Sequence, residues 1–470
     1  MATPPKHIVV LMLENRSFDH MLGHLAHGGL EPVDSDDRNI MDVSRPDGEW
    51  CPAHFLTSDR DVTADPGHGF DDVVRQLTGD EPPLRPEAIT NGGFAWNYAR
   101  RLVERNQDPG LACDIMGCHS AEQVPVLSTL AREFVTCSRW FASVPSETWP
   151  NRLFAHGAQS EGLLKNVIKL YKHRTTFDAL SDARRSWAVY AGDVPQAGAY
   201  VELGDLFKDR FNTIHEFFDD VEHGTLPSYS FLEPSHFIDV DSQHPTHSVH
   251  LGDELLRKVY SALASKPEIW ESLLFLVTYD EHGGFFDRER PPAAVPPSPG
   301  MKAAEHGFGF DVLGVRVPAV VVSPFVEAGV VNDTVRDHSS IVRTVLDALG
   351  VDETLTDRDA AAESVLPLLT REEARAPVPL PPPPARAARA FAAERASTAV
   401  ELDDLQRSLV ELTHLLDEHR APPPRRLAPL PTVGPVSEPV ASRADVEELV
   451  AHFQREHMGS RDARLRRPSS

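Results

Sequence analysis

The stretch "HIVVLMLENRSFDH", His7 to His20, passes from an apolar run directly into a dense polar string. The run His7–Leu13 is rich in β-branched residues and too short for a typical helix, so it predicts a buried strand. Glu14, Asn15 and Arg16 follow at once. Because functional side chains in open parallel sheets gather just beyond the carboxyl ends of the strands, the change in polarity predicts that this strand ends in a site.

Other short apolar runs predict further buried strands, over Ser228–Leu232, Leu273–Thr278 and Val317–Val322. Apolar residues recur on one face over Ser248–Ala264 and Ser339–Leu349, and a Ser-x-x-Gln pattern opens Ser120–Trp140, so all three segments predict helices. Buried strands that alternate with helices predict an α/β fold with a mostly parallel central sheet flanked by helices.

The composition changes near Arg375, where a proline-rich segment begins, and a second such segment begins at Ala421. Amphipathic patterns predict helices over Ala399–Leu416 and Val446–His457. We therefore divide the chain into a main domain, residues 1–370, and a proline-rich, partly helical C-terminal tail, residues 371–470. We expect the tail to be a flexible appendage; the alternatives are that it wraps over the main domain or binds a partner.

The 470-residue chain carries a formal net charge of -25, which argues against non-specific nucleic-acid binding. The longest apolar runs stay under about 10 residues, whereas a membrane-spanning helix needs about 20. The first residues do not form a recognisable signal peptide. We therefore expect a cytoplasmic protein without a transmembrane segment, and export by another route stays open.

Four cysteines, Cys51, Cys113, Cys118 and Cys137, have spacings that match no zinc motif. Free thiols that pack as small apolar side chains are favoured here over a disulfide framework.

Two strand ends deliver acidic residues in the same way. Asp280 and Glu281 come just after the predicted strand Leu273–Thr278, as Glu14 and Asn15 come just after His7–Leu13. Hard oxygen donors of this kind suit a divalent cation, and without one the clustered carboxylates would repel each other. Any one of these acids taken alone could equally form a surface salt bridge or a helix cap.

The segment "SVPSETWPNRLF", Ser143 to Phe154, places a hydroxyl at Thr148 and a guanidinium at Arg152. A hydroxyl beside a metal can be activated as a nucleophile. Arg152 or Arg16 could clamp a phosphate through paired N–H donors. By itself, such a segment is usually an ordinary capped turn.

The chain holds 22 histidines, and several are expected in loops. Histidines around an anionic oxygen can donate hydrogen bonds or protonate a leaving group. For any one of them an ordinary packed or surface position is the alternative, and we expect that position for His119 and His247. The candidates for a functional role are His68, His244, His282 and His338.

Four motifs in order, "ENRSFDHMLG", "SVPSETWPNR", "TYDEHGGFFD" and "DHSSIVRTVL", together resemble the bacterial phosphoesterase family of phosphatidylcholine-type phospholipases C and acid phosphatases. The resemblance implies an alkaline-phosphatase-like fold, with residues 1–370 as the phosphoesterase catalytic domain. It implies that Thr148 is a metal ligand and the nucleophile that forms a phospho-enzyme. The other implied metal ligands are Glu14, Asn15, Asp280 and Glu281, and the implied phosphate-binding or proton-donating histidines are His68, His244 and His338, with His282 adjacent.

The chain departs from the family pattern at Glu147 and Trp149, where the family commonly has Gly-Pro-Thr before Pro-Asn-Arg. This departure leaves the shape of the substrate open. Many members also carry an export signal and C-terminal β-domains, and this sequence shows neither, so we expect extracellular lipid hydrolysis less.

The predicted function is metal-dependent hydrolysis of phosphoric esters, with a phospholipid head group as one candidate substrate. The cation could be calcium, magnesium or manganese, or zinc if a histidine joins the ligands. A sulfatase is disfavoured because Thr148 cannot form formylglycine. The alternative from another class is a degenerate, non-catalytic member that acts as a binding protein. Monoester or diester preference and the oligomeric state stay open.

Overall fold

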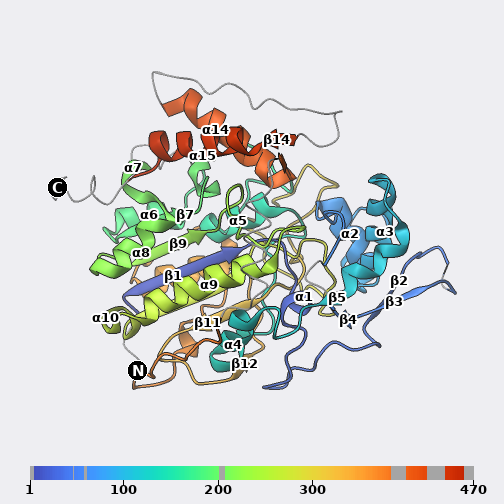
Figure 1. The fold of residues 1–470 in the computed structure, drawn as a ribbon, viewed down its shortest axis with the longest axis horizontal. Coiled ribbons are helices and arrows are strands. Elements are labelled where there is room, and N and C mark those ends of the chain that lie inside the picture. Colours follow the sequence, from blue (N-terminus) through green and yellow to red (C-terminus); the bar gives the residue numbers. More distant parts are fainter. Residues whose placement is uncertain are drawn as a thin grey trace.

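The structure is a computed structural model that describes residues 5–45, 47–57, 61–200, 207–382, 399–420 and 440–459. The second proline-rich segment, from Ala421, lies outside the described residues. Figure 1 shows an elongated molecule in which a central sheet is covered by helices, with a smaller lobe around α2 (Phe70–Thr78) and α3 (Phe94–Glu104) at one end.

Eight strands form the central sheet, which confirms the predicted fold class. Strand β11 runs antiparallel to both of its neighbours, and the other pairs are parallel. The order across the sheet is β12 (Val330–Asn332), β6 (Val135–Cys137), β11 (Ala319–Val322), β10 (Leu273–Tyr279), β1 (His7–Leu13), β9 (Tyr229–Glu233), β7 (Trp187–Ala191) and β8 (Phe211–Thr213).

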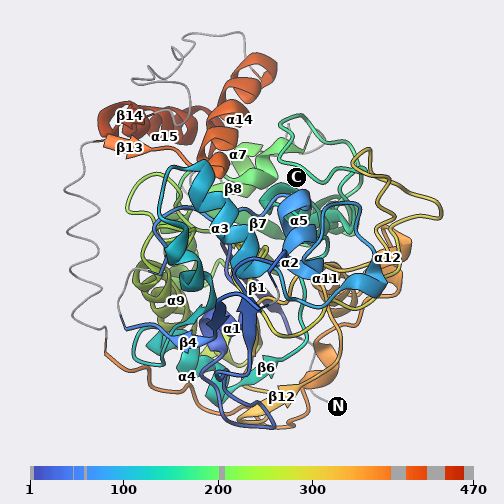
Figure 2. The same cartoon turned by 90° about the vertical axis from the view of Figure 1, so that its right-hand side faces the viewer.

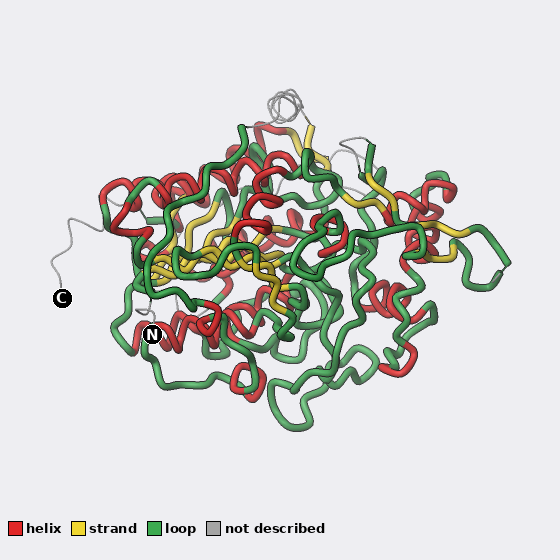
Figure 3. Tube along the Cα trace, turned by 90° about the horizontal axis from the view of Figure 1, so that it is seen from below, coloured by secondary structure: helices red, strands yellow, loops and turns green. Residues whose placement is uncertain are grey.

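Strand β1 lies near the middle of the sheet, between β10 and β9. Its side chains from Ile8 to Leu13 are at most 1% exposed, because helices cover both faces of the sheet. Figure 2 shows α9 (Val249–Ala264) on one side of β1, and α5 (Thr148–Gly157) and α11 (Ser339–Ala348) on the other. Figure 3 shows the same strand layer between helices from below. An apolar run without alternation is the pattern that burial on two faces requires.

The predicted helices over Ser248–Ala264 and Ser339–Leu349 are confirmed as α9 and α11. The prediction over Ser120–Trp140 is partly wrong. Helix α4 covers only Pro125–Glu133, and β6 follows it directly. The Ser-x-x-Gln pattern closes a turn instead, in which the Ser120 N–H donates to the side chain of Gln123.

The remaining elements are short connections and the lobe. The helices are α1 (Phe18–Leu22), α6 (Thr176–Asp182), α7 (Phe207–Arg210), α8 (Ile214–His223), α10 (Pro267–Trp270) and α12 (Asp357–Ala360), and the strands are β2 (Arg38–Ile40), β3 (Trp50–Pro52), β4 (His54–Phe55) and β5 (Gly117–Cys118).

The described parts of the tail pack against the main domain, so the expectation of a flexible appendage is wrong for them. Residues 371–382 run along the surface of the main domain. There the Tyr260 hydroxyl forms hydrogen bonds with the backbone N–H and oxygen of Val378, and the Trp270 indole donates to the Arg375 backbone oxygen. Helices α14 (Asp404–Arg420) and α15 (Arg443–His457) lie along one edge of the molecule (Figure 1), next to the short strands β13 (Ala399–Glu401) and β14 (Val440–Ser442). Their buried leucines belong to the main hydrophobic core.

The expectation for the cysteines is corrected in part. Cys51 on β3 and Cys113 in the 3-10 helix Pro109–Met116 form a disulfide across 62 residues of sequence. Only the packing of the lobe brings these two together, and spacing along the chain could not show it. Cys118 and Cys137 are buried free thiols, as expected.

Candidate active site

Three adjacent strands end at one point on the sheet edge. Leu13 pairs with Tyr279, so Glu14 and Asp280 leave β1 and β10 side by side, and Glu233 ends β9 on the other side of β1. The Asn15 N–H donates to the Asp280 carboxylate at 2.8 Å. The register of the sheet therefore assembles the carboxylates that the sequence placed after separate strands.

The loop after β10 passes very close to β1. Gly283 has φ +63°, and a Cβ on it would lie 2.0 Å from the backbone oxygen of Asn15. Only glycine fits here. The close neighbour of Gly283 is the backbone of the loop that follows β1.

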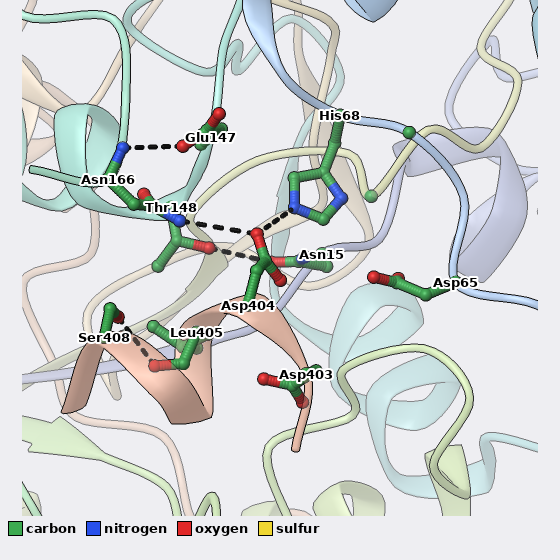
Figure 4. Close-up of polar contacts among 12 residues, drawn as sticks. Asn15, Asp65, His68, Glu147, Thr148, Asn166, Asp403, Asp404, Leu405 and Ser408 are labelled. Carbon is green, nitrogen blue, oxygen red and sulfur yellow. Dashed lines mark hydrogen bonds and ion pairs between the residues drawn. The ribbon is translucent and has the colours of Figure 1, made fainter. Parts of the chain in front are cut away.

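Thr148 is the first residue of α5 and is buried at the same sheet edge. Its hydroxyl lies 3.3 Å from Glu14 Oε2 and 3.3 Å from Asn15 Oδ1 (Figure 4 shows the Asn15 contact). Asn151, one turn along the helix, fixes the preceding loop: its amide donates to the backbone oxygens of residues 144, 146 and 147 and accepts from the N–H of residue 144. The N-terminus of α5 also favours an anion by its dipole.

Arg152 lies among the three carboxylates that end the strands. Its guanidinium is 2.5 Å from Glu14 Oε1, 3.7 Å from Glu233 and 3.8 Å from Asp280. The expectation that Arg152 clamps a phosphate is therefore corrected in part: its main contacts are carboxylates, and only Nη1 is left without a hydrogen-bond partner. A cation buried in this way lowers the repulsion between the acids.

Burial raises the pKa of Glu14 well above its ordinary value, although Arg152 opposes the shift. Burial likewise raises the pKa of Glu281, although the charge of His68 opposes this shift. Asp280 Oδ2 and Glu281 Oε1 are buried oxygens without a hydrogen-bond partner. Unsatisfied acceptors beside an amide oxygen and a hydroxyl fit a divalent cation, which would hold these carboxyl groups in the ionised form.

The described residues also contain three clusters in which histidine and carboxylate ligand atoms lie within 4.8 Å of one another, and none of the three is formed by the predicted ligands. They are His20, Asp61 and His119; His68, His244 and Asp404; and Asp417, His452 and His457. Among the predicted ligands, Glu14 and Asn15 contact the Thr148 hydroxyl, and the Asn15 N–H contacts Asp280.

The prediction that Arg16 clamps a phosphate is corrected. Its guanidinium forms an ion pair with Asp61, donates to the Gln243 backbone oxygen at 2.7 Å, and lies 3.1 Å from His20 Nε2. His119 completes this buried cluster, 3.7 Å from Asp61. The chain turns just before Arg16, at Asn15, whose φ of 57° is in the left-handed region.

His338 and His282 bond groups in and around the loop that follows β10. His338 Nε2 donates to the Asp280 backbone oxygen at 2.5 Å, and its Nδ1 accepts from the Trp140 indole at 3.3 Å. His282 Nε2 donates to Gln76 at 2.7 Å, and its Nδ1 lies 3.3 Å from Glu281. Burial lowers the pKa of both histidines. Both rings bond the scaffold in this structure, which corrects the expectation that they face a phosphate oxygen.

His68 and His244 lie close together on the other side of Thr148, with ring centres 6.1 Å apart. Burial lowers the pKa of His68, but the carboxylates of Glu281 and Asp404 outweigh it and raise the pKa well above its ordinary value. The pKa of His244 is raised in the same way, by Asp403 and other acids, against the effect of burial. Two imidazoles whose pKa values are raised can bind an anion and donate a proton.

A cavity of about 320 Å³ opens beside these histidines. Its lining includes His68, Glu147 and Asp404, and three arginines, Arg101, Arg105 and Arg407. Asp65, Asp72 and Asp403 also line it, so the cavity carries charges of both signs.

The sequence argument missed several residues at the site. Glu233 comes directly after the predicted strand Ser228–Leu232 but was not assigned a role, and His236, three residues later, lies 3.9 Å from Glu14. Glu233 had the same signal as the other strand-end acids. Asn166 and Asp404 had no signal, because a long loop and the tail bring them to the site.

No helix among the described residues is long and apolar enough to cross a membrane.

Residues 5–352 match the Phosphoesterase family. The chain is 32% identical over 441 residues to non-specific phospholipase C3 of Arabidopsis thaliana, covering 88% of this chain and 83% of the relative. It is 35% identical over 384 residues to non-specific phospholipase C1 of the same plant, covering 76% and 70%. Phospholipase C B of Mycobacterium tuberculosis is 29% identical over 399 residues, with 74% of each chain covered.

Among solved structures, a phosphonate monoester hydrolase of Agrobacterium radiobacter matches at a TM-score of 0.37 and 11% identity, over 78% of this chain and 77% of the other. That likeness is weak and says nothing about substrate. The family match and the relatives confirm the predicted class, a phosphoric ester hydrolase. The segment that matches the family, residues 5–352, spans all four motifs. The chain therefore belongs to the Phosphoesterase family.

Proposed function

We propose that the chain is a metal-dependent, phospholipase C-like phosphoester hydrolase in which Thr148 is the nucleophile. The observation that carries the proposal is the position of the Thr148 hydroxyl. It begins α5, 3.3 Å from an oxygen of Glu14 and 3.3 Å from the amide oxygen of Asn15.

A divalent cation would be held by Glu14, Asn15, Thr148, Asp280 and Glu281, and it would supply the charge that ionises the hydroxyl and draws electrons from the phosphoryl group. Thr148 Oγ gives its proton to the Glu14 carboxylate, which accepts from it at 3.3 Å, and attacks phosphorus; the oxygen–phosphorus bond forms as the bond from phosphorus to the leaving oxygen breaks. His68 gives its Nε2 proton to that leaving oxygen. Water then gives a proton to His68 and attacks the phospho-threonine, which releases the phosphoryl product, and Thr148 takes its proton back from Glu14.

The remaining residues prepare this geometry. Asn151 holds the loop that presents Thr148, and His338 holds the backbone of Asp280. Arg152 offsets the charge of the acids, so that they stay together in a buried site. Preorganised groups of this kind do not have to reorganise during the reaction.

Similarity to relatives named phospholipase C supports a phospholipid, or another diester with a polar head group, as the substrate. The binding-protein alternative predicts that phosphate esters bind without turnover.

The test is hydrolysis of p-nitrophenyl phosphate and p-nitrophenyl phosphorylcholine by wild type, Thr148→Ala and Thr148→Ser. We expect activity that EDTA abolishes and added metal restores, a residual rate for Thr148→Ser, and a loss of at least about 1,000-fold for Thr148→Ala. The buried Thr136→Ala, on β6 and away from the site, is the control for folding. Equal rates for wild type and Thr148→Ala would reject the nucleophile. Binding without turnover in wild type would favour the binding protein.

A further inference from the structure

The first residue of the tail helix α14 places a carboxylate inside the candidate site. Figure 4 shows Asp404 pointing into the space between His68 and Thr148. Asp404 Oδ2 lies 3.2 Å from His68 Nε2 and 3.5 Å from the amide nitrogen of Asn166, and its Oδ1 lies 3.9 Å from His244 Nε2. The carboxylate of Asp404, which belongs to the tail, thus contacts the N–H groups of His68 and Asn166.

The nitrogen of His68 that Asp404 contacts is informative. His68 Nδ1 is already engaged with the Pro66 backbone oxygen at 3.1 Å, which orients the ring. Nε2 is therefore the nitrogen left for a substrate, and it bonds Asp404. A carboxylate that merely oriented His68 would hold the far nitrogen. Asp404 instead stands where an anionic substrate oxygen would accept the proton.

The fit of Asp404 is incomplete in a way that suits a larger anion. Asp404 Oδ1 and His244 Nε2 are buried, and neither has a hydrogen-bond partner. A carboxylate offers two oxygens in one plane, whereas a phosphoryl group offers three in a tetrahedral arrangement. A phosphoryl group bound to His68 and Asn166 has a further oxygen for His244, so it satisfies a donor that Asp404 leaves unpaired.

Helix α14 does not need the Asp404 side chain. The adjacent Asp403 forms the N-terminal cap: its carboxylate accepts from the Gln406 N–H at 2.7 Å, and its own N–H donates to the Gln406 side chain at 3.0 Å. Further along, the Trp149 indole donates to Ser408 at 2.7 Å, and Leu409 is buried. The Asp404 side chain can therefore swing out while the helix stays in place.

Two departures from the family pattern join the site to this region. Trp149 reaches α14 through Ser408, and the Glu147 carboxylate accepts from the Asn166 N–H at 2.6 Å. Glu147 and Asp404 line the 320 Å³ cavity, whereas Thr148 does not and is 1% exposed. Asp404 thus borders the cavity and also contacts the groups drawn beside Thr148 in Figure 4.

We propose that Asn166 joins His68 and His244 in the phosphoryl subsite, and that Asp404 is an intramolecular carboxylate occupying this subsite until a substrate phosphate displaces it. The proposal rests on the proposed function of the same site. It makes Asp404 a competitor of every phosphate ligand.

The test uses inorganic phosphate as the probe and the full chain. Its dissociation constant is measured by titration calorimetry, without turnover, and its inhibition constant is measured against p-nitrophenyl phosphate. We expect Asp404→Asn to bind phosphate about tenfold more tightly than wild type, because a charged hydrogen-bond competitor is removed. Asn166→Ala should bind it about tenfold more weakly. Glu411→Gln, which makes the same charge change on the exposed face of α14, should leave both constants unchanged.

Unchanged or weaker phosphate binding by Asp404→Asn would overturn the proposal. A fall in kcat of this variant with an unchanged phosphate affinity would also overturn it, since Asp404 would then position His68. If no protein bound phosphate, the subsite itself would be rejected. The proposed function fails separately, when wild type binds phosphate but turns over no ester.

Discussion

Arg152 gives the sharpest prediction about stability, because it is the buried cation among the strand-end acids. The change Arg152→Met keeps the volume and removes the charge. The Arg152 side chain is 1% exposed, and its guanidinium lies 2.5 Å from the Glu14 carboxylate and 3.7 Å from the Glu233 carboxylate. Removing one partner of a buried ion pair costs about 3–5 kcal/mol, a large part of the usual folding free energy of about 5–15 kcal/mol.

The loss should also depend on pH. Burial already raises the pKa of Glu14, and Arg152 opposes that shift. Without Arg152, the folded-state pKa rises further above the unfolded value of about 4.3. A carboxyl group that keeps its proton longer in the folded state loses stability as the pH rises above the unfolded pKa. The variant should therefore lose the most relative to wild type at about pH 8 and the least near pH 5.

The assay is urea unfolding in EDTA, followed by tryptophan fluorescence across this pH range. The matched control is Arg100→Met on α3, where the arginine is 40% exposed and pairs with Glu81 at 2.7 Å. An exposed pair of this kind is worth about 1 kcal/mol or less, with little pH dependence. If Arg152→Met cost no more than Arg100→Met, or became more stable relative to wild type as the pH rose, the placement of Arg152 would be refuted.

Two further predictions concern the loops that build the site. Asn151→Ala removes the side chain that fixes the loop before Thr148, so kcat on p-nitrophenyl phosphate should fall by about 100-fold with a smaller change in KM; an unchanged kcat would contradict the account. Gly283→Ala places a Cβ against the backbone of Asn15 and should lower both the melting temperature and the bound metal measured by elemental analysis. Gly300→Ala, at a positive φ but in open space, is the control, and equal effects of the two changes would refute the argument from close approach.

Much of the sheet could be predicted because its central strands are buried on both faces. The run His7–Leu13 must be apolar throughout, and the abrupt polar residues after it mark where the strand leaves the core. The strand ends at Glu14 and Asp280 were visible for the same reason. Short edge strands such as β12 carry no such signal, because their residues are only partly buried.

The site was harder to predict wherever a side chain has several possible partners. Arg16 and His338 were expected at the phosphate, yet Arg16 pairs with Asp61, and both nitrogens of His338 bond the scaffold. Composition does not show which way such a side chain turns. Contacts between residues far apart in the sequence, such as Asp404 with His68, depend on how the tail packs on the main domain. The local sequence does not indicate that packing.

The central claim, that Thr148 carries the phosphoryl group, is tested most directly by trapping the intermediate. The enzyme is mixed with p-nitrophenyl phosphate and metal, quenched with concentrated urea at pH 8 within the first turnover, digested and examined by mass spectrometry. The account predicts one phosphoryl group on Thr148 in the wild type and none at this position in Thr148→Ala. A phosphoryl group on a histidine, or product formation at full rate with no phosphorylated Thr148, would contradict it.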